Sequence, residues 1–180
     1  RELVTVSLNT AGLAYGRHVL YVRGVDASGR AGTPSAVYFT VKPFSAIHDY
    51  DGDLRSDIVW RDSASGANQI WRSANNGATV TMTTVPGNAW RLVAQGDFDG
   101  DAKGDVFWRN SSTGANVIWR SGNSATAQAV ATVTSQAWRV VGAGDFDGDG
   151  KADLFWRNMT NGQNVIWRSA SAGATIATST

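Results

Sequence analysis

The chain alternates short apolar stretches with polar, glycine-rich turns, and apolar residues hardly ever recur at helical spacing. In the middle of the sequence, residues 90–95, 106–109 and 116–120 are each predicted to form a short strand between turns. A weaker run of alanine, valine and threonine at 129–134 predicts a fourth strand. We therefore expect an all-β fold.

This strand pattern recurs with an offset of 48 residues. The segment DYDGDLRSDIVWR begins at Asp49, DFDGDAKGDVFWR at Asp97 and DFDGDGKADLFWR at Asp145. Four short antiparallel strands in a unit of this length are typical of one β-propeller blade. The pattern predicts three four-stranded blades at about 43–86, 88–134 and 136–180. The strand at 106–108 is apolar at every position, as expected for a sheet covered on both faces.

Three blades are fewer than a closed propeller contains, since such propellers typically have about 4–8. We expect the missing neighbours to be other blades of a longer parent chain or other copies of this chain. The sequence leaves both partners open.

Residues 1–42 lie outside the repeat. The segments GRHVLYVRGVDASG and SAVYFTV resemble the last strands of an immunoglobulin-like or fibronectin-like module of bacterial secreted enzymes. Such a β-sandwich has about 7 strands in roughly 100 residues. The resemblance implies that 1–42 is the C-terminal part of such a module and that the propeller blades occupy 43–180.

The composition removes several classes of function. The 16 basic and 15 acidic residues give a net charge of +1, which does not favour a nucleic-acid partner. The chain has no cysteine, so disulfides, thiolate nucleophiles and cysteine-bound zinc are excluded. No apolar run approaches the roughly 20 residues of a membrane span.

Twelve of the 15 acidic residues fall in three loops of the pattern D-x-D-x-D-x-x-x-D. They are Asp49, Asp51, Asp53 and Asp57, then Asp97, Asp99, Asp101 and Asp105, then Asp145, Asp147, Asp149 and Asp153. Carboxylates crowded in this way repel each other unless a cation neutralises them. Oxygen ligands in an irregular loop favour calcium, with magnesium second. Zinc would require histidine or cysteine, and the loops contain neither.

An EF-hand is excluded, because its loop needs a glutamate at position 12, where these loops carry tryptophan. The loops, each followed by an apolar strand, instead resemble FG-GAP (VCBS-type) repeats, the calcium-binding blades of integrin α-chain propellers. The resemblance covers about 49–180. It implies one structural calcium ion per loop, about three in the chain, held by the four aspartates at positions 1, 3, 5 and 9. It also implies a backbone carbonyl ligand at position 7, from Arg55, Lys103 and Lys151.

The first two loops depart from the family pattern at position 6. Many such loops carry glycine there, and this sequence has Leu54, Ala102 and Gly150. We expect weaker calcium binding in the first two loops if this position needs a positive φ. His48 also replaces the glycine that precedes the loop in the other units.

Each of the 8 tryptophans is followed by arginine, and neighbours on a strand point to opposite faces. We favour packing between blades, with the tryptophan of one blade meeting the arginine of the next through a cation–π contact. The alternative is an exposed tryptophan platform for sugar rings.

The sequence contains little that could act as a catalyst. Its two histidines, His18 and His48, lie outside the clear repeats, and its only glutamate is Glu2. A pair of loop aspartates resembles the carboxylates of a glycosidase, but these groups are committed to a cation. We expect no enzyme activity.

The resemblance implies a non-catalytic extracellular module, secreted or on the cell surface, that serves binding, adhesion or assembly within a larger protein. Extracellular calcium is abundant enough for loops of this kind. Two alternatives stay open. One is a carbohydrate-binding propeller, and the other is a structural subunit of a homo-oligomer or filament.

Overall fold

A computed structural model describes residues 13–14, 16–41 and 46–178 of the chain. The chain divides into two compact units, Arg1–Phe44 and Ser45–Thr180. All sheets are antiparallel, and the described residues contain helix only as short 3-10 turns. These are η1 (Arg72–Ala74), η2 (Arg120–Gly122), η3 (Ser124–Thr126) and η4 (Arg168–Ala170). The expected all-β class is confirmed.

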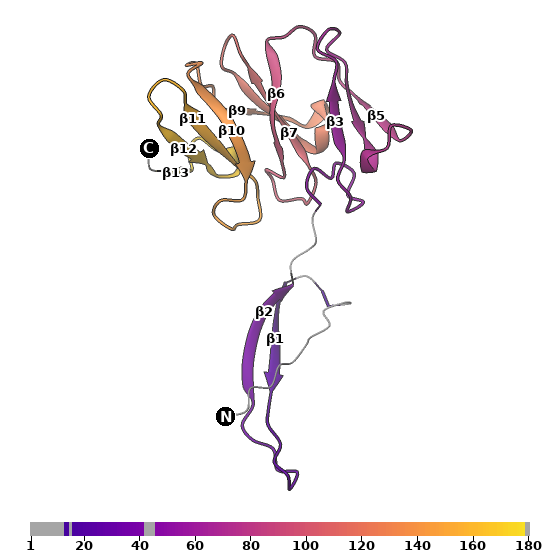
Figure 1. Cartoon of the computed structure of the whole chain (residues 1–180), viewed down its shortest axis with the longest axis vertical. Coiled ribbons are helices and arrows are strands. Elements are labelled where there is room, and N and C mark those ends of the chain that lie inside the picture. The colour runs from indigo at the N-terminus through magenta and orange to yellow at the C-terminus, as the bar shows by residue number, and fades with distance from the viewer. Residues whose placement is uncertain (1–12, 15, 42–45, 179–180) are drawn as a thin grey trace. The chain divides into compact units, whose positions relative to one another are not determined.

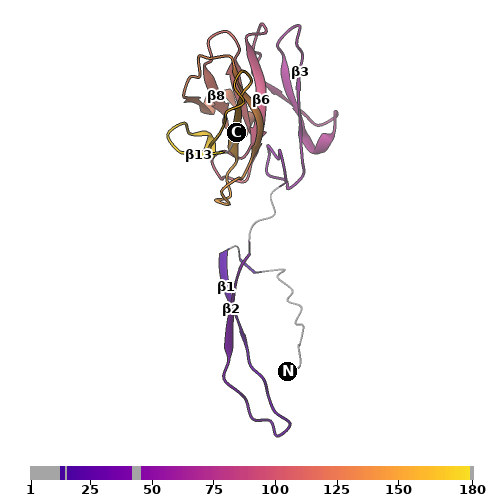
Figure 2. The same cartoon turned by 60° about the vertical axis from the view of Figure 1, so that its left-hand side comes forward.

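The described part of the first unit is one long hairpin, visible in Figures 1 and 2. Strand β1 (Gly16–Val22) pairs along its whole length with β2 (Ser35–Val41). The turn between them is organised by Asp26, whose side chain accepts hydrogen bonds from the N–H groups of Ser28 and Arg30, both at 2.9 Å. The immunoglobulin-like module stays a prediction, since the described residues of this unit form only this two-stranded sheet.

The second unit contains three sheets in chain order, which we call blades 1, 2 and 3 (Figure 1). Blade 1 comprises β3 (Ile58–Arg61), β4 (Asn68–Trp71) and β5 (Thr79–Met82). Blade 2 comprises β6 (Trp90–Gly96), β7 (Asp105–Asn110), β8 (Asn116–Trp119) and β9 (Ala127–Val130). Blade 3 comprises β10 (Trp138–Gly144), β11 (Asp153–Asn158), β12 (Asn164–Trp167) and β13 (Thr175–Ala177).

Each blade is a meander in which consecutive strands pair. The expected four strands are present in blades 2 and 3. In blade 1 the stretch that corresponds to the first strand, 42–48, lies partly outside the described residues.

Consecutive blades pack face to face through two apolar clusters. The first cluster joins blade 1 to blade 2 and contains Tyr50, Ile70 and Met82 with Val106, Trp108 and Trp119. The second joins blade 2 to blade 3 and contains Phe98, Phe107 and Ile118 with Leu154, Trp156 and Trp167. In β7, Val106, Phe107 and Trp108 retain 0%, 0% and 1% of their exposure. The sequence prediction that this strand is covered on both faces is therefore correct.

The fourth strand of blade 2 begins and ends earlier than its composition predicts. The sequence placed it at 129–134, but β9 spans Ala127–Val130. Beyond β9 the chain crosses to the hairpin between β7 and β8. There the carbonyl of Ala131 accepts from the Asn116 amide at 2.7 Å, and the carbonyl of Val133 accepts from Arg109 at 2.9 Å. The backbone of this segment is thus bonded to side chains of the hairpin and to the carbonyl of Gly114 in its turn, instead of to a neighbouring strand.

This crossing explains the repeated glycine of blades 1 and 2. Gly114 has a φ of +77° at the end of the β7–β8 turn, a conformation that glycine adopts readily. A Cβ atom there would lie 2.0 Å from the carbonyl oxygen of Val133. Gly66 has the same φ and the same close approach in blade 1.

Candidate metal centres

The acidic loops lie at one end of the blades. In blades 2 and 3 the loop joins the first strand to the second, and in blade 1 it precedes β3. The aspartate at position 1 organises each loop by accepting backbone hydrogen bonds. Asp97 accepts from the N–H groups of Gly100 and Ala102, at 2.6 and 2.8 Å, and Asp49 and Asp145 accept from the corresponding positions of their own loops.

The aspartates at positions 3 and 5 curve the loop further, because each accepts a hydrogen bond from the N–H group two residues later. The side chain of Asp99 accepts from the N–H of Asp101 at 3.2 Å, and Asp101 accepts from the N–H of Lys103 at 2.8 Å. The other two loops repeat both bonds. The curl brings the carboxylates toward a common point, as the alternating spacing predicts.

Three carboxylates in each loop offer oxygen atoms within 4.8 Å of one another. The sets are Asp49, Asp51 and Asp53, then Asp97, Asp99 and Asp101, then Asp145, Asp147 and Asp153. Clusters made of carboxylate oxygens alone suit a hard divalent cation. The residues present therefore fit a metal ion, and Asp149 is the one aspartate from positions 1, 3 and 5 that is absent from its cluster.

The aspartate at position 9 also closes the loop. Asp105 has no exposed surface, and its two oxygens accept from the N–H of Phe98 at 2.9 Å and of Ser121 at 2.8 Å. Asp57 and Asp153 make the same pair of bonds in their own blades.

Burial, opposed in part by these hydrogen bonds, raises the pKa of Asp105 to about 6. Burial also raises the pKa of Asp97. The metal-ligand role of all twelve loop aspartates stays a prediction, as does that of the backbone carbonyls at position 7.

In each loop, the aspartate at position 3 forms an ion pair with an arginine. Arg72 bonds Asp51 at 3.0 Å, Arg120 bonds Asp99 at 2.5 Å, and Arg168 bonds Asp147. The Arg168 guanidinium lowers the pKa of the Asp147 carboxyl. This role differs from the packing between blades that the sequence predicts for the arginines of the Trp–Arg pairs. These arginines recur directly after the third strand of each unit, and this regular position in the sequence could have indicated a shared role.

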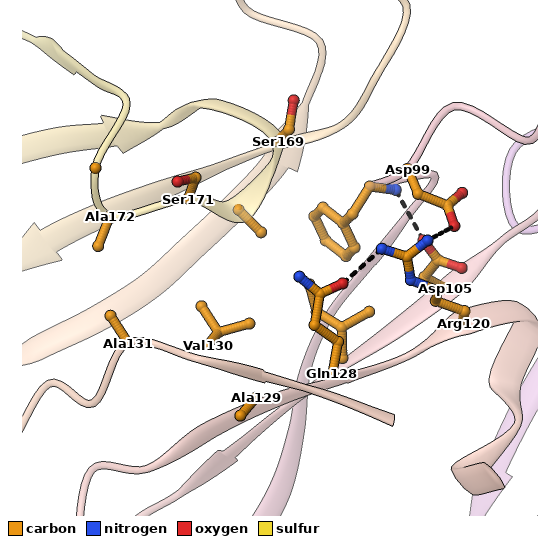
Figure 3. A pocket seen from close by; sticks show the side chains of 14 residues that line it. Asp99, Asp105, Arg120, Gln128, Ala129, Val130, Ala131, Ser169, Ser171 and Ala172 are labelled. Atoms are coloured by element: carbon orange, nitrogen blue, oxygen red, sulfur yellow. Dashed lines mark hydrogen bonds and ion pairs between the residues drawn. The ribbon is translucent and has the colours of Figure 1, made fainter. Parts of the chain in front are cut away.

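Figure 3 shows how this arrangement borders a small hollow at the blade 2–blade 3 junction. Arg120 donates to Asp99 and, at 2.5 Å, to the side-chain oxygen of Gln128 on β9. Each guanidinium therefore holds the position-3 carboxylate from the side of its own blade. Arg120 thus already supplies one positive charge to Asp99, and a bound metal ion would share this carboxylate with the arginine.

Neighbouring loops are joined directly through their backbones. The N–H of Gly104 donates to the carbonyl of Asp49 at 2.5 Å, and the N–H of Ala152 donates to the carbonyl of Asp97 at 2.6 Å. A Cβ on Gly100 would lie 3.2 Å from the Lys151 side chain. The conformation of one loop therefore supports that of the next.

Position 6 adopts a positive φ in all three loops. The values are +67° at Leu54, +67° at Ala102 and +89° at Gly150. The condition under which the sequence predicts weaker binding in the first two loops is thus met. Non-glycine residues in this region carry strain of roughly 1–2 kcal/mol per residue.

The two histidines lie outside the acidic clusters. His18 donates to the backbone carbonyl of Ala14 at 2.6 Å, and burial lowers the pKa of His48. The part of the chain that the structure describes contains no hydrogen bond from either imidazole to a hydroxyl or a carboxylate.

The chain matches a known family of repeats. The pattern of the FG-GAP-like repeat fits residues 49–108 and again residues 97–156, which together cover more than half of the chain. Neither a curated protein nor a solved structure shows significant similarity to the chain. Among the described residues, no helix has the length and apolarity required to span a membrane.

Proposed function

Since the chain belongs to the FG-GAP-like repeat family, we propose that it is a calcium-stabilised, non-catalytic module for binding or adhesion outside the cell. The observation that carries the proposal is the recurrence of one carboxylate cluster in each of three successive loops. Repeats of this family are typically extracellular binding or adhesion modules, and abundant extracellular calcium would keep such loops occupied.

Calcium would act here by stabilising the fold. Asp97, Asp99 and Asp101 converge in one loop, and a divalent ion would offset their mutual repulsion. Binding only to the folded loop would raise the free energy of unfolding by mass action. Because each loop bonds to the next, ordering one loop would also stabilise its neighbour. Calcium tolerates irregular geometry better than magnesium, so it is the preferred ion.

Thermal unfolding with and without a chelator tests this proposal. We expect the melting temperature to fall by many degrees in chelator and to recover with calcium more than with magnesium. Elemental analysis of Asp99→Ala and Asp147→Ala should each show the loss of about one ion per chain. The matched control is Asp62→Ala, an exposed aspartate outside the clusters, which should retain all ions. A melting temperature unaffected by chelator would refute the calcium role.

A second role, assembly, is favoured by the two outer blade faces. At the inner junctions, Arg61 of blade 1 lies 5.2 Å from the ring centroid of Trp108, and Arg109 lies 5.1 Å from that of Trp156. Tryptophan and arginine of adjacent blades thus pack together, but in the reverse of the predicted order, because the arginine belongs to the earlier blade and the tryptophan to the later one. The equivalent groups on the outer faces, Trp60 and Arg157, are both exposed.

The outer faces are otherwise built like the inner ones. Trp60 is 46% exposed, whereas its counterpart Trp108 is 1% exposed. Phe146 of blade 3 is 49% exposed, whereas Phe98 is 4% exposed. One outer face therefore presents an uncovered indole, and the other presents an exposed guanidinium on the same blade as an uncovered aromatic ring. We propose that blade 3 of one copy docks on blade 1 of a second copy, with Arg157 over Trp60.

Light scattering over a concentration series in calcium tests this assembly. We expect the apparent mass to rise above 19.1 kDa with concentration. Arg157→Gln and Trp60→Ser should each lower it, and mixing the two variants should not restore more than a dimer, since each retains one intact face. Arg23→Gln, in the other unit, is the charge-matched control. A monomer at all concentrations would refute contact between copies.

A further inference from the structure

The two inner junctions join successive acidic loops by the same backbone hydrogen bond. The N–H group at position 8 of one loop donates to the position-1 carbonyl of the preceding loop. This bond links Gly104 to Asp49 at 2.5 Å and Ala152 to Asp97 at 2.6 Å. The first and second loops are therefore each completed by a backbone donor from the following blade.

The two outer faces each carry one half of this bond. Among the described residues, no blade follows blade 3, and none donates a hydrogen bond to the carbonyl of Asp145 at position 1 of the third loop. Ser56 is at position 8 of the first loop, and its N–H group has no acceptor among the described residues. Both residues are exposed. The acceptor of one face and the donor of the other correspond to the bond that is made twice inside the chain.

The side chain at position 7 crosses the glycine at position 4 of the preceding loop. A Cβ atom on Gly100 would lie 3.2 Å from the side chain of Lys151, and the junction of blades 1 and 2 repeats this close approach. A Cβ atom on Gly148, the glycine of the third loop, would meet no described atom within 4 Å. The position-7 residue of the first loop is Arg55, which is exposed. A second copy placed against blade 3 would bring Arg55 across Gly148.

Apolar side chains beside the loops divide in the same way. The residue after position 9 is fully buried in blades 2 and 3, as Val106 and Leu154, whereas its counterpart Ile58 in blade 1 is 40% exposed. Val106 and Leu154 belong to the clusters that contain the position-2 ring of the preceding loop. The position-2 ring of the third loop is the exposed Phe146. Ile58 of a second copy would therefore cover Phe146.

The third acidic loop also differs from the other two in its carboxylates. Asp49 is buried and Asp97 is half-buried at position 1, whereas Asp145 is exposed. Positions 1, 3 and 5 converge in the first two loops, but Asp149 at position 5 is absent from the third cluster. The loop without a covering blade is thus the one with a different arrangement of oxygen atoms. A second copy would give it the surroundings that the other loops have.

We infer that a second copy of the chain completes the third acidic loop and that calcium controls this contact. The Ser56 N–H of the second copy donates to the carbonyl of Asp145, and its Arg55 crosses the glycine at position 4. A contact that orders the loop raises its calcium affinity, and by linkage calcium strengthens the contact by the same factor. This inference rests on the proposed assembly and adds to it a donor–acceptor pair and a regulating ion.

Hydrogen exchange of backbone amides tests the contact without any substitution. Gly104 and Ala152, whose N–H groups are bonded inside the chain, should exchange slowly at every protein concentration. In calcium, Ser56 should exchange about tenfold more slowly once about nine-tenths of the protein is assembled, because only free copies expose its N–H. Assembly that leaves the Ser56 amide unprotected would overturn the inference.

Two matched aspartate variants test the control by calcium. Asp147→Ala and Asp99→Ala each remove the position-3 carboxylate, from the third and the second cluster respectively. Asp147→Ala should raise the protein concentration at half-assembly about tenfold, since coupling between sites typically changes affinity by about 5–150-fold. Asp99→Ala, at an inner junction, should leave this concentration unchanged. Circular dichroism confirms that both variants are folded, and equal effects of the two would overturn the link to calcium.

Substitutions at the donor test the bond itself. Ser56→Pro removes the backbone N–H and should raise the concentration at half-assembly about fivefold, whereas Ser56→Ala keeps the N–H and should leave it unchanged. Arg55→Gln should also weaken assembly, and it provides a test at the neighbouring position if Ser56→Pro does not fold. Unchanged assembly in folded Ser56→Pro and in Arg55→Gln would contradict the proposed contact.

This inference and the proposals before it fail separately. A monomer at all concentrations removes the assembly role together with this contact and leaves calcium stabilisation in place. Assembly with an unprotected Ser56 amide retains the assembly role and removes only the contact inferred here.

Discussion

The carboxylate of Asp105 accepts a 2.8 Å hydrogen bond from the backbone N–H of Ser121, a residue in the turn after the third strand of the same blade. Ser121 has a φ of +47°, a left-handed conformation that is uncommon for residues other than glycine, and its N–H points toward Asp105. The other oxygen of Asp105 bonds Phe98 within the acidic loop. One buried carboxylate thus ties the loop to the end of β8. The same bond from Ser73 to Asp57 and from Ser169 to Asp153 makes it a feature of the repeat.

The first prediction concerns pH in the calcium-free protein. Burial raises the pKa of Asp105 from 3.8 to about 6, so between these values the folded state holds this proton more tightly than the unfolded state does. The contribution of Asp105 to stability is therefore present at low pH and is lost as the pH rises through about 6. Chemical unfolding in chelator between pH 4 and pH 7 should show this trend relative to Asp105→Asn. An identical pH dependence in the two proteins would contradict it.

The same proton competes with a cation. Burial, and in addition the charges of Asp99 and Asp97, raise the pKa of Asp105, so a divalent ion bound beside these carboxylates would displace its proton. Calcium affinity measured by calorimetry should fall as the pH drops below about 6. In Asp105→Asn, this proton-linked part of the decrease should be absent.

A second prediction compares position 6 of two loops. Ala102 has a φ of +67°, where glycine is favoured, so Ala102→Gly should stabilise the protein by about 1 kcal/mol. Gly150→Ala places the opposite change in the third loop and should destabilise it by a similar amount. A Cβ at Gly150 would meet no atom within 4 Å, so the expected loss comes from the backbone alone. Chemical unfolding in saturating calcium measures both.

The corresponding calcium affinities should move in the same directions. Ala102→Gly should strengthen the second site, and Gly150→Ala should weaken the third. If both substitutions changed stability with the same sign, the strain at position 6 would be the wrong explanation.

A third prediction concerns the arginine beside each cluster. Arg120 bonds Asp99 at 2.5 Å and places a positive charge next to the proposed cation. Arg120→Gln should remove that repulsion and free Asp99, so the second site should bind calcium several-fold more tightly at low ionic strength. The gain should shrink in high salt. The control Arg23→Gln should not change the affinity, and weaker binding in Arg120→Gln would show that the arginine instead orients Asp99 for the ion.

A fourth prediction separates the two faces of the blades. Trp108 is buried between blades 1 and 2, packs 5.0 Å from Trp119 and lies beneath Arg61. Trp108→Ala should cost about 3–5 kcal/mol. Trp60→Ala removes the equivalent, exposed ring of blade 1 and should cost much less in dilute protein. Equal losses in chemical unfolding would contradict the assignment of inner and outer faces.

Much of this architecture is predictable from the sequence alone. The 48-residue period, the strand order within a blade and the aspartates of each loop follow from side-chain types that recur at regular spacing. Burial of 106–108 on both faces follows from its unbroken apolar pattern. Even the positive φ at Ala102 was foreseeable, because glycine occupies that position in the third loop. These features depend on residues that are close together in the chain.

The tertiary structure decided which partner each repeated residue meets. The eight Trp–Arg pairs look alike in the sequence, yet Arg109 packs on the next blade, Arg120 bonds its own loop, and Arg91 faces an open groove. The early end of β9 likewise depends on side-chain donors of the neighbouring hairpin. Such differences arise from sheet register and blade packing, which bring together residues about 15–50 positions apart. A local pattern of side chains does not specify those contacts, so only the folded chain distinguishes the partners of the repeated residues.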